Sequence, residues 1–190
     1  CGQTYCYSVR GISAIPMLSL EECITADSNE PPPAVEDLSI RPEGSGLALN
    51  WVYTGSAEFD VYRSIDGRQP DLLTTVSTTE FMDMDVGHAQ DFEYCYEIVP
   101  KDACANANPN NSIGCAYTPS GGIDAQDNVT LSWRPYTGYL AGVDFYEVEK
   151  SYDGVNFTST GQTADTTFFE TDMQTDAQVI YYRIQAYSTN

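Results

Sequence analysis

A short cysteine pattern repeats along this chain and constrains its fold more than any other feature. The run Tyr5–Tyr7 reads Tyr-Cys-Tyr and is followed by Cys23, and the identical run Tyr94–Tyr96 is followed by Cys115. Ile180–Ile184 is a degenerate third copy without cysteine. Such self-similarity predicts a row of similar units. A row of modules is typical of a spacer, a stalk or a binding surface rather than of a catalyst.

The stretch between residues 34 and 119 carries short runs of alternating apolar and polar residues. We expect strands at Val35–Ile40, Gly46–Trp51, Phe59–Ser64, Leu72–Ser77, Glu80–Asp83, Phe92–Val99 and Gly114–Tyr117. Turn signals such as the pair Asp66-Gly67 separate these runs. Short strands with turns between them indicate an antiparallel sandwich.

Matching segments divide the chain into three parts. Trp133 follows the matching Trp51 by 82 residues, and the strand pattern then continues to a sixth strand. We expect an all-β chain of tandem antiparallel β-sandwiches that is incomplete at both ends. Its parts are 1–30, the last two strands of a preceding module, 34–119, a complete module, and 121–190, a third module without its last strand. Pro31–Pro33 forms a stiff linker, and a longer parent protein is expected.

Charge excludes two classes of partner. The chain has 28 acidic and 8 basic residues, a formal net charge of −20. This excludes a basic nucleic-acid footprint and a polybasic membrane surface, and no apolar run approaches the roughly 20 residues of a spanning helix. A solvated acidic surface that keeps an exposed protein soluble explains the charge. Adaptation to salt and binding of divalent cations are the alternatives.

The cysteines favour disulfides over a metal. There are 6 cysteines and 1 histidine, and no two cysteines stand in the close-set pairs that zinc prefers. Disulfides form in oxidising compartments, so we expect an extracellular, cell-surface or secreted protein.

A set of aromatic residues resembles the fibronectin type III pattern. These residues are Trp51, Tyr62, Tyr96, Trp133 and Tyr182. Three finer runs look like repeats of large Bacteroidota cell-surface proteins: Val61–Gly67, Tyr94–Tyr96 and Lys101–Asn106. Such proteins are exported by the type IX secretion system and resemble gliding-motility-associated adhesins. The resemblance therefore implies sandwich modules on a cell surface.

The resemblance also implies a disulfide framework. Cys6–Cys23 and Cys95–Cys115 would each bridge the sixth and seventh strands of one module. The two remaining cysteines, Cys1 and Cys104, would meet where one module follows another and clamp the proline linker. In the alternative arrangement, Cys1 pairs with a residue upstream and Cys104 is free or locally bonded.

Aromatic side chains are assigned to faces by alternation. Trp51 and Trp133 point inward rather than toward a stacked ligand. Tyr96 and Tyr182 are expected in the core. Tyr94 and Tyr181 are expected on the outer face, where surface packing competes with contact to a sugar or a protein.

No motif for catalysis or cofactor binding occurs, so we expect a non-enzyme without cofactor. Asp83, Asp85 and Asp91 are weak calcium candidates, because a hard cation needs six to eight oxygen ligands and no complete loop motif is present. His88, the single histidine, is expected to be solvated. A carboxylate pair for glycoside hydrolysis would need a cleft.

Four residues are glycosylation candidates. Asn110, Asn128 and Asn156 each begin an N-glycan acceptor pattern. Thr166 lies in Asp165–Thr167, which resembles the O-glycan acceptor of Bacteroidota.

These patterns support one hypothesis and two alternatives. The hypothesis is a non-catalytic extracellular repeat region of a large bacterial surface adhesin or filament, acting as a disulfide-stiffened spacer or binding stalk. Its partners would be adjacent modules of the same chain and a surface glycan or protein. The alternatives are an accessory region of a secreted polysaccharide-degrading enzyme and a self-assembling fibre that exchanges strands.

Overall fold

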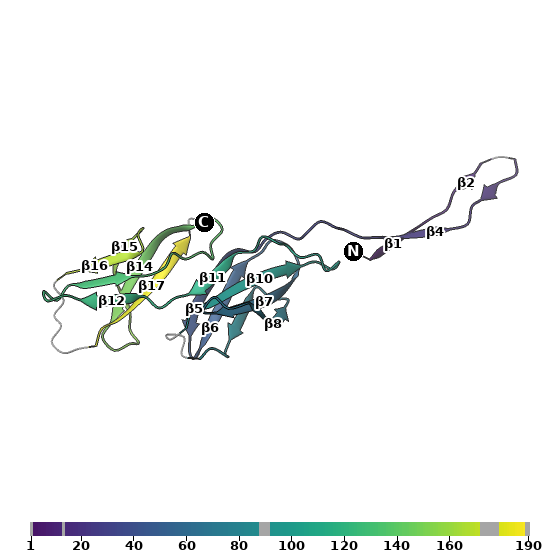
Figure 1. Cartoon of the computed structure of the whole chain (residues 1–190). Coiled ribbons are helices and arrows are strands. Elements are labelled where there is room, and N and C mark those ends of the chain that lie inside the picture. Colours follow the sequence, from purple (N-terminus) through teal and green to yellow (C-terminus); the bar gives the residue numbers. More distant parts are fainter. Residues whose placement is uncertain (1, 13, 88–91, 172–178, 189–190) are drawn as a thin grey trace.

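The chain folds into a long hairpin followed by two sandwiches that lie end to end (Figure 1). The computed structural model describes all residues except 1, 13, 88–91, 172–178 and 189–190. Every strand pair among the described residues is antiparallel. The predicted all-β class of tandem antiparallel sandwiches is confirmed. The described residues contain no helix long and apolar enough to span a membrane.

The central sandwich consists of two sheets. Its strands are β5 (Glu36–Glu43), β6 (Gly46–Val52), β7 (Glu58–Ile65), β8 (Asp71–Val76), β9 (Glu80–Asp83), β10 (Tyr94–Lys101) and β11 (Ile113–Ala116). One sheet has the order β5-β6-β9 and the other β11-β10-β7-β8. This is the strand order of a fibronectin type III sandwich. Asp66 and Gly67, the predicted turn pair, both have positive φ, and the Arg68 N–H donates to the Ile65 carbonyl at 3.1 Å. They are therefore the central residues of a type I′ β-turn that follows β7.

Alternation along β6 and β10 builds the central core. Leu47, Leu49 and Trp51 point inward from β6. The Trp51 ring meets Phe59 edge-on, with ring centroids 5.4 Å apart. This inward position of Trp51 is the predicted one.

The prediction for Tyr94 is wrong. Tyr94 is only 3% exposed and belongs to the core together with Tyr96 and Ile98. Residues two apart in a strand share a face, so Tyr94 must follow Tyr96 inward. Cys95 between them points to the opposite face, where it bonds Cys115.

The C-terminal sandwich repeats this arrangement. Its strands are β12 (Ser120–Ile123), β13 (Val129–Ser132), β14 (Val143–Ser151), β15 (Thr158–Thr163), β16 (Thr167–Glu170) and β17 (Tyr181–Ser188). The sheets have the orders β12-β13-β16 and β15-β14-β17. Trp133 meets Tyr146 edge-on at 5.4 Å, as Trp51 meets Phe59. Tyr181 is 45% exposed, whereas Tyr182 packs against the core.

A buried carboxylate links the two sheets of the central sandwich. Asp83 Oδ2 in β9 accepts a hydrogen bond from the Tyr96 hydroxyl of β10 at 2.8 Å. The same oxygen lies 2.8 Å from Arg63 Nη1 of β7. Burial and the Asp83 contact both raise the pKa of Tyr96 above its ordinary value. Tyr96 therefore stays protonated and acts as the hydrogen-bond donor.

The C-terminal sandwich has the same cluster with different residues. Glu170 in β16 lies 2.5 Å from Lys150 Nζ of β14 and accepts a hydrogen bond from the Tyr182 hydroxyl of β17 at 2.9 Å. Carboxylate, phenol and cation thus come from the equivalent strands in both sandwiches. The three-way contact is a repeated feature of the module.

The N-terminal hairpin stands apart from both sandwiches. It comprises β1 (Gln3–Tyr7), β2 (Arg10–Gly11), β3 (Met17–Leu18) and β4 (Glu22–Ala26). The Cys6–Cys23 disulfide crosses β1 and β4 with a Cα–Cα distance of 4.0 Å, and Cys95–Cys115 crosses β10 and β11 at the same distance. Tyr5 and Tyr7, which flank Cys6, are 45% and 59% exposed.

Replacing Trp51 by alanine should destabilise the central sandwich by about 3–5 kcal/mol, the range for deleting a large aromatic side chain from a core. Denaturant unfolding, resolved by hydrogen exchange of β6 and β10, measures the loss. Ile123→Ala, at an exposed site, is the control and should change stability by less than about 0.5 kcal/mol. An unchanged midpoint for Trp51→Ala would place the ring outside the core.

Glu170 should make the C-terminal sandwich sensitive to acid. Burial raises the pKa of Glu170, but hydrogen bonds from Lys150, Thr160 and Tyr182 outweigh it and hold that pKa below the ordinary 4.5. The stabilisation is therefore complete above about pH 4.5 and is lost as pH falls through the lower folded pKa.

Thermal unfolding of the chain and of Glu170→Gln, measured between about pH 3 and pH 7, isolates this contribution because the variant cannot titrate at this position. The difference between the two midpoints should shrink as the pH falls below about 4.5. A difference that stays constant over this range would contradict the assignment.

Candidate functional site

The two sandwiches meet at a tyrosine of the C-terminal sandwich that packs against the central sandwich. Tyr136 lies in the loop between β13 and β14, and its hydroxyl donates to the Leu38 carbonyl of β5 at 2.5 Å. Thr137 Oγ1 donates to the Ile113 carbonyl of β11, also at 2.5 Å. Burial raises the pKa of Tyr136, so its hydroxyl stays a donor. Two strands of the central sandwich therefore hold one loop of the next.

The same loop is fixed to its own sandwich. The backbone N–H of Tyr136 donates to the Tyr146 hydroxyl at 3.0 Å. The Tyr136 and Tyr139 rings meet edge-on with centroids 4.9 Å apart, and the Tyr139 hydroxyl donates to the Ala186 carbonyl at 3.2 Å. The inserted tyrosine is thus held from both sides.

Two glycines permit the close approach. A Cβ on Gly114 would lie 2.8 Å from the Tyr136 hydroxyl and 3.0 Å from Ile40 Cδ1. A Cβ on Gly138 would overlap both the Leu38 carbonyl and the Tyr136 ring. Neither φ lies in the left-handed region, so space rather than backbone conformation explains these glycines.

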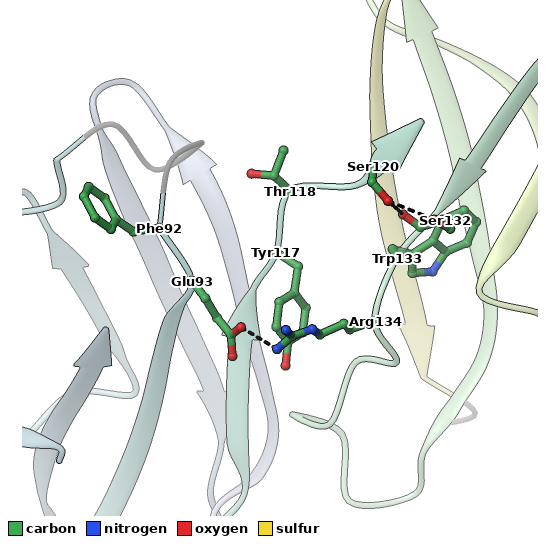
Figure 2. Close-up of a pocket in the computed structure, with 8 residues that line it drawn as sticks. All are labelled: Phe92, Glu93, Tyr117, Thr118, Ser120, Ser132, Trp133 and Arg134. Carbon is green, nitrogen blue, oxygen red and sulfur yellow. Dashed lines mark hydrogen bonds and ion pairs between the residues drawn. The ribbon is translucent and has the colours of Figure 1, made fainter. Parts of the chain in front are cut away.

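An ion pair closes the other side of the junction, as Figure 2 shows. Arg134 Nη1 lies 2.5 Å from Glu93 Oε2, and the guanidinium covers the Tyr117 ring at 5.5 Å from its centroid. Burial, followed by the charge of Glu93, raises the pKa of Tyr117. The connection between β11 and β12 is only Tyr117–Pro119. A short connection and contacts on two sides restrict the interdomain motion that is otherwise the default.

A hollow of about 420 Å³ opens between the sandwiches beside this ion pair. It is lined by Phe92, Glu93, Tyr117, Thr118, Ser120, Ser132, Trp133 and Arg134 (Figure 2). Two pairs of its polar groups contact each other: Arg134 with Glu93, and the Ser120 hydroxyl with the Ser132 hydroxyl at 2.8 Å. The buried Trp133 Nε1 has no hydrogen-bond partner among the described residues. These lining residues include no nucleophile next to a base. The contacts around the hollow thus serve to hold the two modules at a fixed angle.

The opposite end of the central sandwich holds the proline linker. Asn106 Nδ2 donates to the Ser28 carbonyl at 2.6 Å, and Asn108 Nδ2 donates to the Pro32 carbonyl at 2.8 Å. Cys104 in the same loop is disulfide-bonded. Its predicted partner Cys1 lies outside the described residues, so the Cys1–Cys104 clamp stays a prediction.

The calcium candidates have other contacts. Asp83 is occupied by Arg63 and Tyr96, and its second oxygen accepts the backbone N–H of Asp85 at 3.0 Å. Asp85 Oδ2 lies 3.4 Å from Arg63. Asp91 and the predicted solvated His88 lie outside the described residues. The carboxylate–cysteine groups at both described disulfides offer no thiolate ligand, because their cysteines are bonded to each other.

The four glycosylation candidates differ in accessibility. Asn110 and Asn156 are exposed, whereas Asn128 and Thr166 are half-buried. Asn156 Nδ2 is held by Asp153 at 2.7 Å and Asn128 Nδ2 by Asp124 at 2.9 Å. Asn110 thus has the most accessible acceptor position of the three asparagines.

A five-residue loop was missed by sequence reasoning. In Asp102–Asn106 and in Asp124–Asn128, the aspartate Oδ1 accepts two backbone N–H groups and its Oδ2 accepts the asparagine Nδ2. The side-chain hydrogen bond to the asparagine is the first cause of a lowered pKa at both aspartates. The sequence motif Asp-Ala-x-x-Asn, which both loops share, was the signal that could have predicted them.

Comparisons with known proteins add a likeness in shape. No protein-family model and no curated protein matches the chain. Among solved structures, the FN1–FN3 domains of chicken CNTN1 match at 11% identity and a TM-score of 0.38, over 90% of this chain and 65% of that one. The central fibronectin-III array of RIM-binding protein matches at 11% and 0.38, over 86% and 62%. The chain thus spans less than two thirds of either structure, and its fold class rests on its own strand order.

Tyr136→Ala should uncouple the sandwiches. We expect it to lower the unfolding free energy of the C-terminal sandwich by about 2–4 kcal/mol, because a large side chain and a buried hydrogen bond are lost together. Hydrogen exchange read by mass spectrometry on β5, β13 and β14 measures the effect on each side.

Gly114→Val is the test from the other side, because it displaces Tyr136 without a substitution in the C-terminal sandwich. Since its side chain also crowds Leu38 and Ile40 of β5, its effect on coupling is read in β13 and β14. Tyr139→Phe, which removes a hydrogen bond within one sandwich, is the control and should leave exchange in β5 unchanged. If hydrogen exchange in β5 and β14 is unchanged in both junction variants, the Tyr136 contact does not couple the stability of the two sandwiches.

Proposed function

We propose that this chain is a non-catalytic extracellular repeat region of a bacterial surface adhesin or filament, in which it acts as a stiff spacer or binding stalk. The observation that carries the proposal is the insertion of Tyr136 between β5 and β11. A catalytic scaffold needs a cleft with a reacting group, whereas this junction uses its polar groups to fix one module against the next. The geometry therefore suits transmission of position and force along the chain.

Disulfides support an extracellular setting. Two cross-strand disulfides are present among the described residues: Cys6–Cys23 in the exposed N-terminal hairpin and Cys95–Cys115 in the central sandwich. Such bonds persist in oxidising surroundings, and each should stabilise its hairpin by roughly 3 kcal/mol in the chain-entropy model. The net charge of −20 suits a protein that stays soluble outside the cell.

The finer assignment rests on the likeness of Val61–Gly67 and Lys101–Asn106 to Bacteroidota surface repeats. It brings with it export by the type IX secretion system and a gliding-motility-type adhesin. Adjacent modules of the same chain, and a surface glycan or protein, are the partners of this proposal.

The N-terminal hairpin fits the role of the last two strands of another sandwich. Its face with Tyr5 and Tyr7 corresponds to the face of β10 with Tyr94 and Tyr96. The first pair is exposed and the second is buried. An isolated two-stranded hairpin is only marginally stable in water. The hairpin would therefore be stabilised if this face were buried in the core of a sandwich. Residues 1–30, 34–119 and 121–190 would then belong to three successive modules.

Pulling the chain by its ends tests the mechanical function. Each sandwich should resist force and unfold in its own step. The Cys95–Cys115 bond spans 20 residues, so reduction should lengthen the central step by about 65 Å at 3.3–3.6 Å per residue. A Cys95→Ala/Cys115→Ala double variant should show the longer step without reductant.

Two results would contradict the proposal. Extension without resolved force steps would rule out a mechanical spacer. Release of reducing ends from a polysaccharide by the purified chain, abolished by one carboxylate substitution, would favour a glycoside hydrolase instead.

A further inference from the structure

A second hollow lies on the outer face of the sheet β11-β10-β7-β8, away from the junction. Its volume is about 330 Å³, at the small end of the range of about 300–1,000 Å³ for ligand sites. It is lined by Tyr62, Gln69, Pro70, Glu97, Val99, Asn108, Pro109 and Asn111. The lining thus comes from two neighbouring strands and from the loops that follow β7 and β10.

The lining combines apolar walls with planar polar groups. Tyr62, Val99 and two prolines offer apolar surface, while Gln69, Asn108 and Asn111 offer amides. Each amide has an acceptor oxygen and two donor hydrogens, and the Glu97 carboxylate accepts at two oxygens. A sugar presents C–H faces that pack on a ring and neighbouring hydroxyls that both donate and accept. These two kinds of surface match the lining.

The polar groups are held in place before any ligand arrives. Asn111 Nδ2 donates to Glu97 Oε1 at 3.1 Å and to the Asn108 carbonyl at 2.9 Å. Asn108 Oδ1 accepts the backbone N–H of Asn110 at 2.8 Å. Glu97 is the direct cross-strand partner of Tyr62. Preorganisation of this kind lowers the entropy cost of binding.

One acceptor in the wall of the hollow has no hydrogen-bond partner among the described residues. Asn111 Oδ1 is buried and accepts no hydrogen bond from the described residues. A buried acceptor without a donor costs about 1–3 kcal/mol. Because this oxygen is buried, a ligand in the hollow does not reach it. The acceptor that the lining presents to a ligand is the half-buried Glu97 carboxylate.

We propose that this hollow binds a short, uncharged saccharide. No cationic side chain lines it, and Glu97 together with the net charge of −20 opposes an anionic sugar. A proline-rich peptide would also pack on Tyr62 and Pro70. However, proline brings no N–H, whereas the Glu97 carboxylate accepts hydrogen bonds and therefore favours hydroxyl donors. The proposal stands independently of the spacer role.

NMR titration of the ¹⁵N-labelled 190-residue chain tests the proposal. The probes are cellohexaose, xylohexaose, mannohexaose and chitohexaose, added separately. At least one should shift the side-chain amide resonances of Gln69, Asn108 and Asn111. Tyr62→Ala and Asn111→Ala should each weaken that binding at least tenfold.

Controls separate binding from folding and from peptide recognition. Tyr181→Ala, at an exposed tyrosine of the other sandwich, should leave the affinity unchanged, and well-dispersed backbone resonances should show that each variant is folded. If no hexasaccharide shifts these amides at millimolar concentration, the saccharide assignment is wrong. Shifts from a decaproline peptide alone would identify a peptide site and equally overturn it.

Discussion

A carboxylate between the two sheets, buried in the central sandwich and half-buried in the next, is the contact that links the sheets of each sandwich. In the central sandwich Asp83 receives the Tyr96 hydroxyl and the Arg63 guanidinium, and in the next Glu170 receives Tyr182 and Lys150. Burying a charge is costly unless it is paired and hydrogen-bonded, and removal of one partner leaves the other unpaired. The recurrence with exchanged residue types shows that the geometry, rather than one particular side chain, is retained.

This contact fixes the strands that reach the junction. Asp83 ends β9 and Tyr96 lies near the start of β10, so their hydrogen bond ties the end of one sheet's strand to the start of a strand in the other sheet. Glu93 directly precedes β10 and pairs with Arg134 of the next sandwich. On the other side, Tyr136 inserts beside β5 and β11. The core of one module and its angle to the next are therefore physically connected.

The strands could be predicted from sequence because their signal is local. Alternation of Leu47, Leu49 and Trp51 located β6 and its inward face, and the repeated Tyr-Cys-Tyr run located two hairpins. The same rule was misapplied to Tyr94, which shares a face with Tyr96. Strand ends shifted by up to three residues, because hydrogen bonding rather than hydropathy determines them.

The candidate site could not be predicted because its signal is not local. Tyr136 lies in a loop outside the strand pattern, and its partner is the backbone carbonyl of Leu38, a group that every residue type carries. Gly114 and Gly138 are informative only once the tyrosine lies against them. Asp83 was a calcium candidate in the sequence analysis because its actual partners, Arg63 and Tyr96, come from strands distant in sequence and could not be recognised there. The periodicity of residues within one module does not predict contacts between modules.

The most direct test of the account is the distance between spin labels on the two sandwiches. Spin labels at the exposed positions Ser77 and Gln162 are introduced through non-natural residues, so that the disulfides stay intact. Pulsed electron–electron double resonance then measures the distance between the two labels and so reports the interdomain geometry. The account predicts a single narrow distance distribution that broadens in Tyr136→Ala and stays narrow in Tyr139→Phe. A broad distribution in the unaltered chain, unchanged by Tyr136→Ala, would contradict a fixed junction.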